Sequence, residues 1–154
     1  MVAFHPLADS TRHRLTAGGL DPEAVAALAR MAITEDLAGG IDVTSTATVP
    51  AGQRSRATYG ARRAGTICGL AVAAAVIDTV CGDAASSFDY LVDDGDRVPA
   101  GTALARVTAP TRLLLTAERT SLNLLSHLSG VATLTTRWAD ALEGTPAREI
   151  GRAH

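Results

Sequence analysis

Four polar side chains form a stripe through the leucine-rich segment near residue 120. Steps of three, four and three residues place them along one side of a helix; they are Thr116, Arg119, Asn123 and Ser126. Leucines occupy much of the rest of this helix. An arginine among leucines is costly to desolvate unless it meets an anion, and its planar fork fits a carboxylate or a phosphate. The pattern singles out Arg119 as a candidate anion-binding residue.

Spacing alone leaves other roles open for Arg119. Its guanidinium could pair with Glu118 or another nearby acid, or extend to water, and these structural roles are commoner than ligand binding. His127, on the same helix, is likewise more often a satisfied or exposed histidine than a catalyst. No catalytic residue and no metal ligand follows from spacing.

The composition excludes several kinds of chemistry. All 14 basic residues are arginines, so the chain has no lysine for a Schiff base, a phosphate-binding loop or attachment of biotin or lipoate. A net charge of -2 gives no attraction to nucleic acid or to anionic membranes, so we expect neither as a partner. Cys68 and Cys81 lie in apolar stretches without a second ligand at metal-binding spacing, which predicts buried free thiols.

The apolar segments are short. The longest run, residues 70–77, cannot span a bilayer, and the N-terminus lacks the apolar core of a signal peptide. These features favour a cytoplasmic protein.

The stripe needs neighbouring elements to position it. Residues 21–37 are typical of an amphipathic helix, with an aspartate cap, a proline in the first turn and glycines after the end. Over residues 54–69, apolar and polar residues alternate as in strands, which predicts two short strands. Residues 70–80 are apolar almost all round, so a helix there must be covered on more than one side. A sheet on one side and a second subunit on the other would provide that cover.

Two further strands are expected over residues 87–92 and 102–107. The segment that joins them, residues 93–101, is rich in aspartate and glycine, which is typical of turns. It lacks the alternating ligands and distal glutamate of a calcium loop. We therefore interpret it as a solvated turn.

The helix that carries the stripe is expected over residues 112–128. Ser129-Gly130 is expected to interrupt it before a second helix over residues 131–142. Residues 1–20 show no period and predict a flexible lead-in. The order of helices and strands predicts the α+β class.

Three stretches resemble segments of the quinolinate phosphoribosyltransferases. The first is Glu35-Asp36-Leu37, followed by Gly40-Ile41-Asp42-Val43-Thr44-Ser45 and Thr48-Val49-Pro50. The second is Gly65-Thr66-Ile67-Cys68-Gly69-Leu70. The third is Thr116-Ala117-Glu118-Arg119-Thr120, then Asn123, and then His127-Leu128-Ser129-Gly130-Val131-Ala132-Thr133. The resemblance implies a hammerhead-type open-faced α/β sandwich over residues 21–128, joined by linking helices to an α/β barrel. Residues 129–154 would then be the start of a truncated barrel domain with a divergent tail.

The resemblance also implies a function in NAD biosynthesis. The family converts quinolinate and phosphoribosyl pyrophosphate into nicotinate mononucleotide, pyrophosphate and CO2, with magnesium bound through the barrel. By the family's pattern, Arg119 reaches across a dimer interface to a quinolinate carboxylate, which implies a homodimer or higher homo-oligomer. The catalytic residues and metal ligands belong to the barrel, so we expect none in this chain and no activity from it alone.

Two alternatives stay open. Residues 146–154 depart from the family's Asp-Thr-Arg-Lys-Thr strand, as a frameshift or a shortened gene model would produce, so the residues that fix the substrate are missing. The chain could thus come from the paralogous phosphoribosyltransferase found with molybdate transport genes. It could also be a non-catalytic dimerisation or carrier-like hammerhead module, although a carrier needs a lysine.

Overall fold

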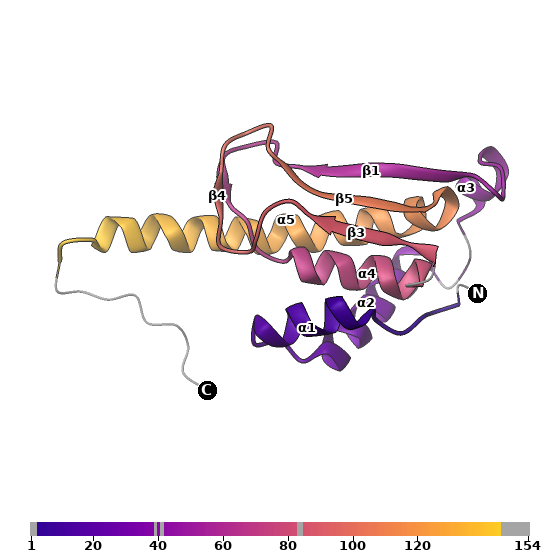
Figure 1. Ribbon diagram of the computed structural model, residues 1–154, viewed down its shortest axis with the longest axis horizontal. Coiled ribbons are helices and arrows are strands. Elements are labelled where there is room, and N and C mark those ends of the chain that lie inside the picture. The colour runs from indigo at the N-terminus through magenta and orange to yellow at the C-terminus, as the bar shows by residue number, and fades with distance from the viewer. Residues whose placement is uncertain (1–2, 39, 41, 83–84, 146–154) are drawn as a thin grey trace.

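The computed structural model describes residues 3–38, 40, 42–82 and 85–145 (Figure 1). In chain order, its elements are α1 (Asp9–Ala17), α2 (Pro22–Asp36), α3 (Val43–Thr48), β1 (Arg54–Gly60), β2 (Gly65–Thr66), α4 (Leu70–Cys81), β3 (Ser87–Tyr90), β4 (Arg97–Val98), β5 (Ala103–Pro110) and α5 (Thr111–Leu142). This mixture of helices and antiparallel strands confirms the α+β prediction.

The three longer strands form an antiparallel sheet in the order β1-β5-β3. In its register, Arg54 of β1 lies opposite Pro110 of β5, and Ser87 of β3 lies opposite Thr108 of β5. A second, two-stranded ribbon pairs β2 with β4. Figure 1 shows the larger sheet as the top layer, α4 and α5 below it, and α1 and α2 below α4. The sheet therefore has one face on the helices and one open face.

The main core lies between this sheet and the helices α4 and α5. Tyr59 of β1 and Val107 of β5 pack here with Val76 and Ile77 of α4, and all four are buried. The Tyr59 hydroxyl is 2.8 Å from the Ser121 hydroxyl of α5. Burial raises the pKa of Tyr59 to about 12, so the phenol stays protonated and can hold this hydrogen bond.

Helix α4 is buried at all twelve of its residues within the single chain. Its second face packs in a smaller core, where Leu15 of α1 and Ala26 of α2 meet Val72 and Ala75. The expectation that a second subunit covers this helix is therefore wrong. The cover comes from α1 and α2.

The lead-in expected over residues 1–20 is also wrong for residues 9–17, which form α1. Three side chains spaced by four residues, Leu7, Thr11 and Leu15, are buried. Two leucines separated by a threonine are too few apolar residues to reveal the helical period in the sequence. The helix is fixed by the α4 face that it covers.

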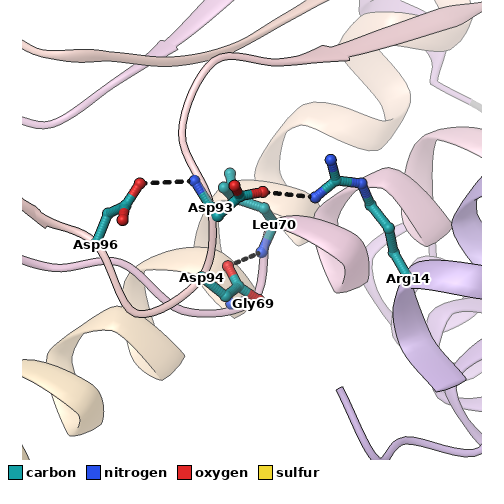
Figure 2. A network of polar contacts seen from close by, with 6 residues as sticks. All are labelled: Arg14, Gly69, Leu70, Asp93, Asp94 and Asp96. Atoms are coloured by element: carbon teal, nitrogen blue, oxygen red, sulfur yellow. Dashed lines mark hydrogen bonds and ion pairs between the residues drawn. The ribbon is translucent and has the colours of Figure 1, made fainter. Parts of the chain in front are cut away.

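The acidic turn after β3 also holds α1 and α4 in place (Figure 2). The Asp94 carboxylate accepts the backbone N–H groups of Gly69 and Leu70, each at 3.0 Å, at the start of α4. Asp93 pairs with Arg14 of α1 at 2.9 Å, and the Arg14 guanidinium lies 3.9 Å from the centre of the Tyr90 ring. The turn is thus more than a solvated connection, because Asp94 caps a buried helix.

Helix α5 runs without a break from Thr111 to Leu142, so the expected interruption at Ser129-Gly130 is wrong. A glycine within a helix costs about 1 kcal/mol relative to alanine, which the packing of a long helix can offset. The last turns of α5 leave Val131, Leu134 and Trp138 more than half exposed. No helix in the described ranges is long and apolar enough to cross a membrane.

Candidate functional site

Arg119 lies at a corner where the end of α2, the short helix α3 and the first half of α5 meet. A shallow depression of about 300 Å³ opens there. Its lining residues are Asp36, Leu37, Asp42, Val43, Thr44, Leu115, Thr116 and Arg119. We call this the Arg119 depression. It joins the first stretch of the family resemblance to the third.

The Arg119 guanidinium points toward the last residue of α2. Its Nη1 atom is 3.4 Å from Oδ1 of Asp36, and the two side chains are 75% and 26% exposed. Arg119 is therefore exposed and paired with an acid, which is one of the structural roles that its spacing left open. Leu114 and Leu125 of α5 turn inward to the core, which turns Arg119 outward to solvent. The nearby acid is Asp36 rather than Glu118.

The floor of the depression is held by hydrogen bonds. Asp42 caps α3, and its carboxylate accepts the backbone N–H of Ser45 at 2.9 Å and the hydroxyl of the same residue. The hydrogen bond from the Ser45 hydroxyl has the larger effect and that from the Ser45 N–H the next; both lower the pKa of Asp42 below its ordinary value. On α5, Arg112 Nε donates to the Val49 carbonyl at 2.7 Å. These bonds anchor the backbone around the depression, whereas the exposed Arg119 side chain makes a single contact of 3.4 Å, with Asp36.

The polar stripe predicted from the sequence is divided among three places. Thr116 is buried, and its hydroxyl donates to the Arg112 carbonyl at 3.0 Å. Asn123 borders a neighbouring hollow of about 370 Å³ that also includes Asp36. Ser126 lines a wider groove of about 820 Å³ between α5 and the loop after β1. The stripe is therefore not one binding site.

The second and third stretches of the resemblance meet in a different way, through hydroxyl groups of α5. The Thr133 hydroxyl accepts the N–H of Thr66 at 2.9 Å and donates to its carbonyl at 3.3 Å. The Ser129 hydroxyl contacts the N–H and the carbonyl of Cys68, both at 3.1 Å. Thr136 lies 2.9 Å from the Thr66 hydroxyl. We call these five residues the hydroxyl junction.

Two glycines allow α5 to approach the chain closely at this junction. A Cβ atom on Gly65 would lie 2.6 Å from the Thr133 hydroxyl, and one on Gly69 would lie 2.6 Å from Leu128. Gly69 also has a φ of 100°, which side-chain-bearing residues rarely adopt. Sequence reasoning missed this junction. Two pairs of residues in the sequence could have indicated it: Gly65 and Gly69, and Ser129 and Thr133 on the helix, each pair four residues apart.

The two cysteines are free, as predicted, but only Cys81 is buried. Burial raises the pKa of the Cys81 thiol to about 12. Burial, and then the charge of Asp94, raises the pKa of half-buried Cys68. Neither environment favours a reactive thiolate.

The Arg119 depression supports recognition of charge. A guanidinium can bind a carboxylate or phosphate through two parallel hydrogen bonds, and this one is accessible. Across the described part of the chain, no three histidine, cysteine, aspartate or glutamate side chains are grouped to hold a metal ion. His127 lies exposed on α5.

A family model described as "Quinolinate phosphoribosyl transferase, N-terminal domain" matches residues 42–129. The nicotinate-nucleotide pyrophosphorylase (carboxylating) of Mycobacterium leprae is 47% identical over 119 residues, which are 77% of this chain and 42% of that protein. Quinolinate phosphoribosyltransferase (decarboxylating) 1b of Nicotiana tabacum is 34% identical over 73% of this chain and 31% of its own length.

Solved structures give the same result for the fold. NadC from Streptococcus pyogenes aligns with a TM-score of 0.73 and 31% identity, covering 80% of this chain and 44% of that chain. The nicotinate-nucleotide pyrophosphorylase of Francisella tularensis aligns with a TM-score of 0.70 and 31% identity over 79% and 42% of the two chains. The hammerhead-type sandwich is confirmed. The chain spans less than half the length of the relatives it matches.

Proposed function

The chain belongs to the quinolinate phosphoribosyl transferase family through its N-terminal domain, and from this premise we propose that it forms part of an enzyme of NAD biosynthesis. The reaction is transfer of a phosphoribosyl group from phosphoribosyl pyrophosphate to the ring nitrogen of quinolinate. Pyrophosphate leaves, the adjacent carboxylate is lost as CO2, and nicotinate mononucleotide remains. The named relatives favour quinolinate over the substrate of the molybdate-transport paralogue.

The observation that carries this proposal is the state of Arg119. It lies within the matched stretch of the family model, and its guanidinium is 75% exposed with one contact at 3.4 Å. A guanidinium held so weakly is available to a carboxylate of a ligand. Quinolinate carries two carboxylates that must be neutralised and oriented, and arginine suits this task because its geometry is bidentate.

In this mechanism, the chain's own contribution is binding and orientation. Arg119 would hold one quinolinate carboxylate, so that the ring nitrogen faces the phosphoribosyl carbon. Its positive charge would also offset the repulsion between an anionic substrate and a pyrophosphate leaving group. The proposal includes the family's arrangement, in which Arg119 acts in the active site of the partner subunit of a homodimer. A cytoplasmic location is part of the same proposal.

Magnesium is expected to assist departure of pyrophosphate, but the described residues do not fit a site for it. No three potential ligands are grouped in the described ranges. Asp42, which lines the Arg119 depression, already uses its carboxylate to cap α3. We assign no step of the mechanism in this chain to the metal.

A fused enzyme tests the proposal. Residues 1–142 of this chain would be joined to the part of the Mycobacterium leprae relative that follows the match, and formation of nicotinate mononucleotide would be measured. We expect turnover with quinolinate. Arg119→Ala should raise the KM for quinolinate roughly ten- to a hundredfold, since a charged hydrogen bond is lost. Arg119→Lys should recover only part of this loss, because an ammonium lacks the bidentate fork.

Arg137, an exposed arginine further along α5, provides the matched control. Arg137→Ala removes the same charge and should leave the KM for quinolinate unchanged. Mixed dimers test the assignment across the interface: Arg119→Ala subunits combined with subunits inactivated in the barrel should regain one working site. Mixed dimers that form and stay inactive would contradict that assignment, and an unchanged KM in Arg119→Ala would contradict the role of Arg119 altogether.

A further inference from the structure

Arg119 needs a restraint if it is to bind a carboxylate well. An exposed arginine samples many rotamers, and fixing them costs up to about 2 kcal/mol of conformational entropy. Preorganisation by a neighbouring group reduces this cost before the ligand arrives. The packing around Arg119 cannot supply the restraint, since its side chain is 75% exposed.

Asp36 is placed to supply it. It is the last residue of α2, whose preceding turn is anchored by the fully buried Ile33. Its side chain is 26% exposed against 75% for Arg119, so Asp36 is the more fixed member of the pair. The other acid of the depression, Asp42, faces Ser45 instead. Within the described ranges, Asp36 is thus the acid that pairs with this guanidinium.

The contact engages only one nitrogen of Arg119. Asp36 Oδ1 accepts from Nη1 at 3.4 Å, and no residue in the described ranges forms a hydrogen bond or ion pair with Nη2 or Nε. These two nitrogens form the side edge of the guanidinium, which is one of the two edges that pair with a carboxylate. One acid can therefore hold the arginine while a second carboxylate binds it.

We propose that Asp36 is a positioning residue for Arg119, holding Nη1 so that the Nε and Nη2 edge is presented to a carboxylate of the substrate. This inference rests on the proposed function, which assigns the substrate carboxylate to Arg119. Residue 36 lies outside the stretch that the family model matches, residues 42–129. The placement of Asp36 against Arg119 carries the inference.

Kinetics of the fused enzyme test the inference. Asp36→Asn keeps the shape and removes the charge, so the KM for quinolinate should rise about two- to fivefold, the range that an exposed ion pair contributes. The kcat and the KM for phosphoribosyl pyrophosphate should not change. Asp36→Glu should give an intermediate KM. Glu35→Gln removes an adjacent exposed charge that forms no ion pair with an arginine of the described ranges, and it is the matched control, expected to behave as the wild type.

Coupling between the two residues separates positioning from a general charge effect. In an Arg119→Ala background, Asp36→Asn should not change the KM further, because the residue that it positions is absent. In the 154-residue chain itself, 15N relaxation of the Arg119 Nε–H group should show more motion in Asp36→Asn and no change in Glu35→Gln. This second measurement needs no activity and also reports whether each variant folds.

The outcomes distinguish the two proposals. A KM for quinolinate that is unchanged in Arg119→Ala overturns the proposed function. A raised KM in Arg119→Ala with an unchanged KM in Asp36→Asn overturns only the positioning role. A KM that falls in Asp36→Asn also overturns it, since Asp36 would then compete with the substrate for the arginine.

Discussion

The Arg119 depression and the hydroxyl junction both lie on α5 and both join segments distant in sequence, yet they are built differently. At the junction, neutral hydroxyls bind backbone groups at 2.9 to 3.3 Å across a close approach that only glycines permit. At the depression, one charged contact of 3.4 Å joins two side chains, one of them 75% exposed. The junction is thus a set of partly buried hydrogen bonds, whereas the depression contains one ion pair whose arginine is accessible to solvent.

This difference explains why one family resemblance can contain residues with unrelated roles. Gly65, Gly69, Ser129 and Thr133 need their types for packing and for backbone hydrogen bonds. Under the proposed function, Arg119 needs its type for a ligand, because among the described residues its charge is used only in the exposed pair with Asp36. If this division is correct, substitutions at the junction should cost stability and substitutions at the depression should not.

Gly69→Ala should have the largest effect on stability. An alanine at this position must adopt a φ near 100°, and its Cβ would lie 2.6 Å from Leu128, whose side chain must move. The strain and the displacement together cost about 2–4 kcal/mol. The midpoint of thermal unfolding should fall by roughly 5–15 °C. Gly52→Ala is the control, since a Cβ there meets nothing within 4 Å. Equal unfolding temperatures for the two variants would show that the close approach is not required.

Thr133→Val should have the next largest effect. Valine keeps the shape of threonine but leaves the N–H of Thr66 without its acceptor, which costs about 1–2 kcal/mol in a partly buried position. Thr135→Val makes the same change on an exposed position of α5 and should stay within about 0.5 kcal/mol of the wild type. Urea unfolding measures the loss of unfolding free energy in both variants, provided that the dependence of this free energy on urea concentration is the same as in the wild type.

The sequence predicted the central elements well, because their patterns are local. The apolar run at residues 70–80, the alternating strands and the capped helix starting at Pro22 all lie close to where they were expected. The predictions that failed depended on tertiary contacts. Helix α1 forms against a face of α4, and α5 continues through Ser129-Gly130 while Ser129 bonds the backbone of Cys68.

The site shows the same limit. Spacing identified Arg119 as a polar residue in an apolar helix, but it could not show that this side chain turns outward to Asp36, a contact across 83 residues of sequence. It also grouped Thr116 with Arg119; both line the Arg119 depression, but Thr116 is buried and its hydroxyl donates to the Arg112 carbonyl of its own helix. A helical period gives the face of a residue relative to its neighbours. Which face meets the core depends on the other elements.

Asp94→Asn tests a carboxylate that stabilises the fold, and it should lower the free energy of unfolding less than Thr133→Val does. The carboxylate caps α4 by accepting two N–H groups (Figure 2). Asparagine has one acceptor oxygen and no charge to interact with the helix dipole, so we expect a loss of about 1 kcal/mol. Asp93→Asn, in the same turn, breaks a pair whose acid is 75% exposed and should cost less than about 0.5 kcal/mol. Equal losses would contradict the capping role.

Arg119→Ala should have the smallest effect on stability. The variant loses one exposed contact of 3.4 Å, which is worth less than about 0.5 kcal/mol, and alanine slightly favours the helix. Arg112→Ala is the matched control on the same helix, because its partly buried Nε donates to the Val49 carbonyl at 2.7 Å and its loss should cost about 1 kcal/mol. Urea unfolding of the 154-residue chain measures both without any need for activity. A loss above about 1 kcal/mol in Arg119→Ala would mean that the arginine supports the fold, and the contrast between the two regions would then fail. An unchanged stability, together with a raised KM for quinolinate in the fused enzyme, would mean that the charge of Arg119 serves a ligand.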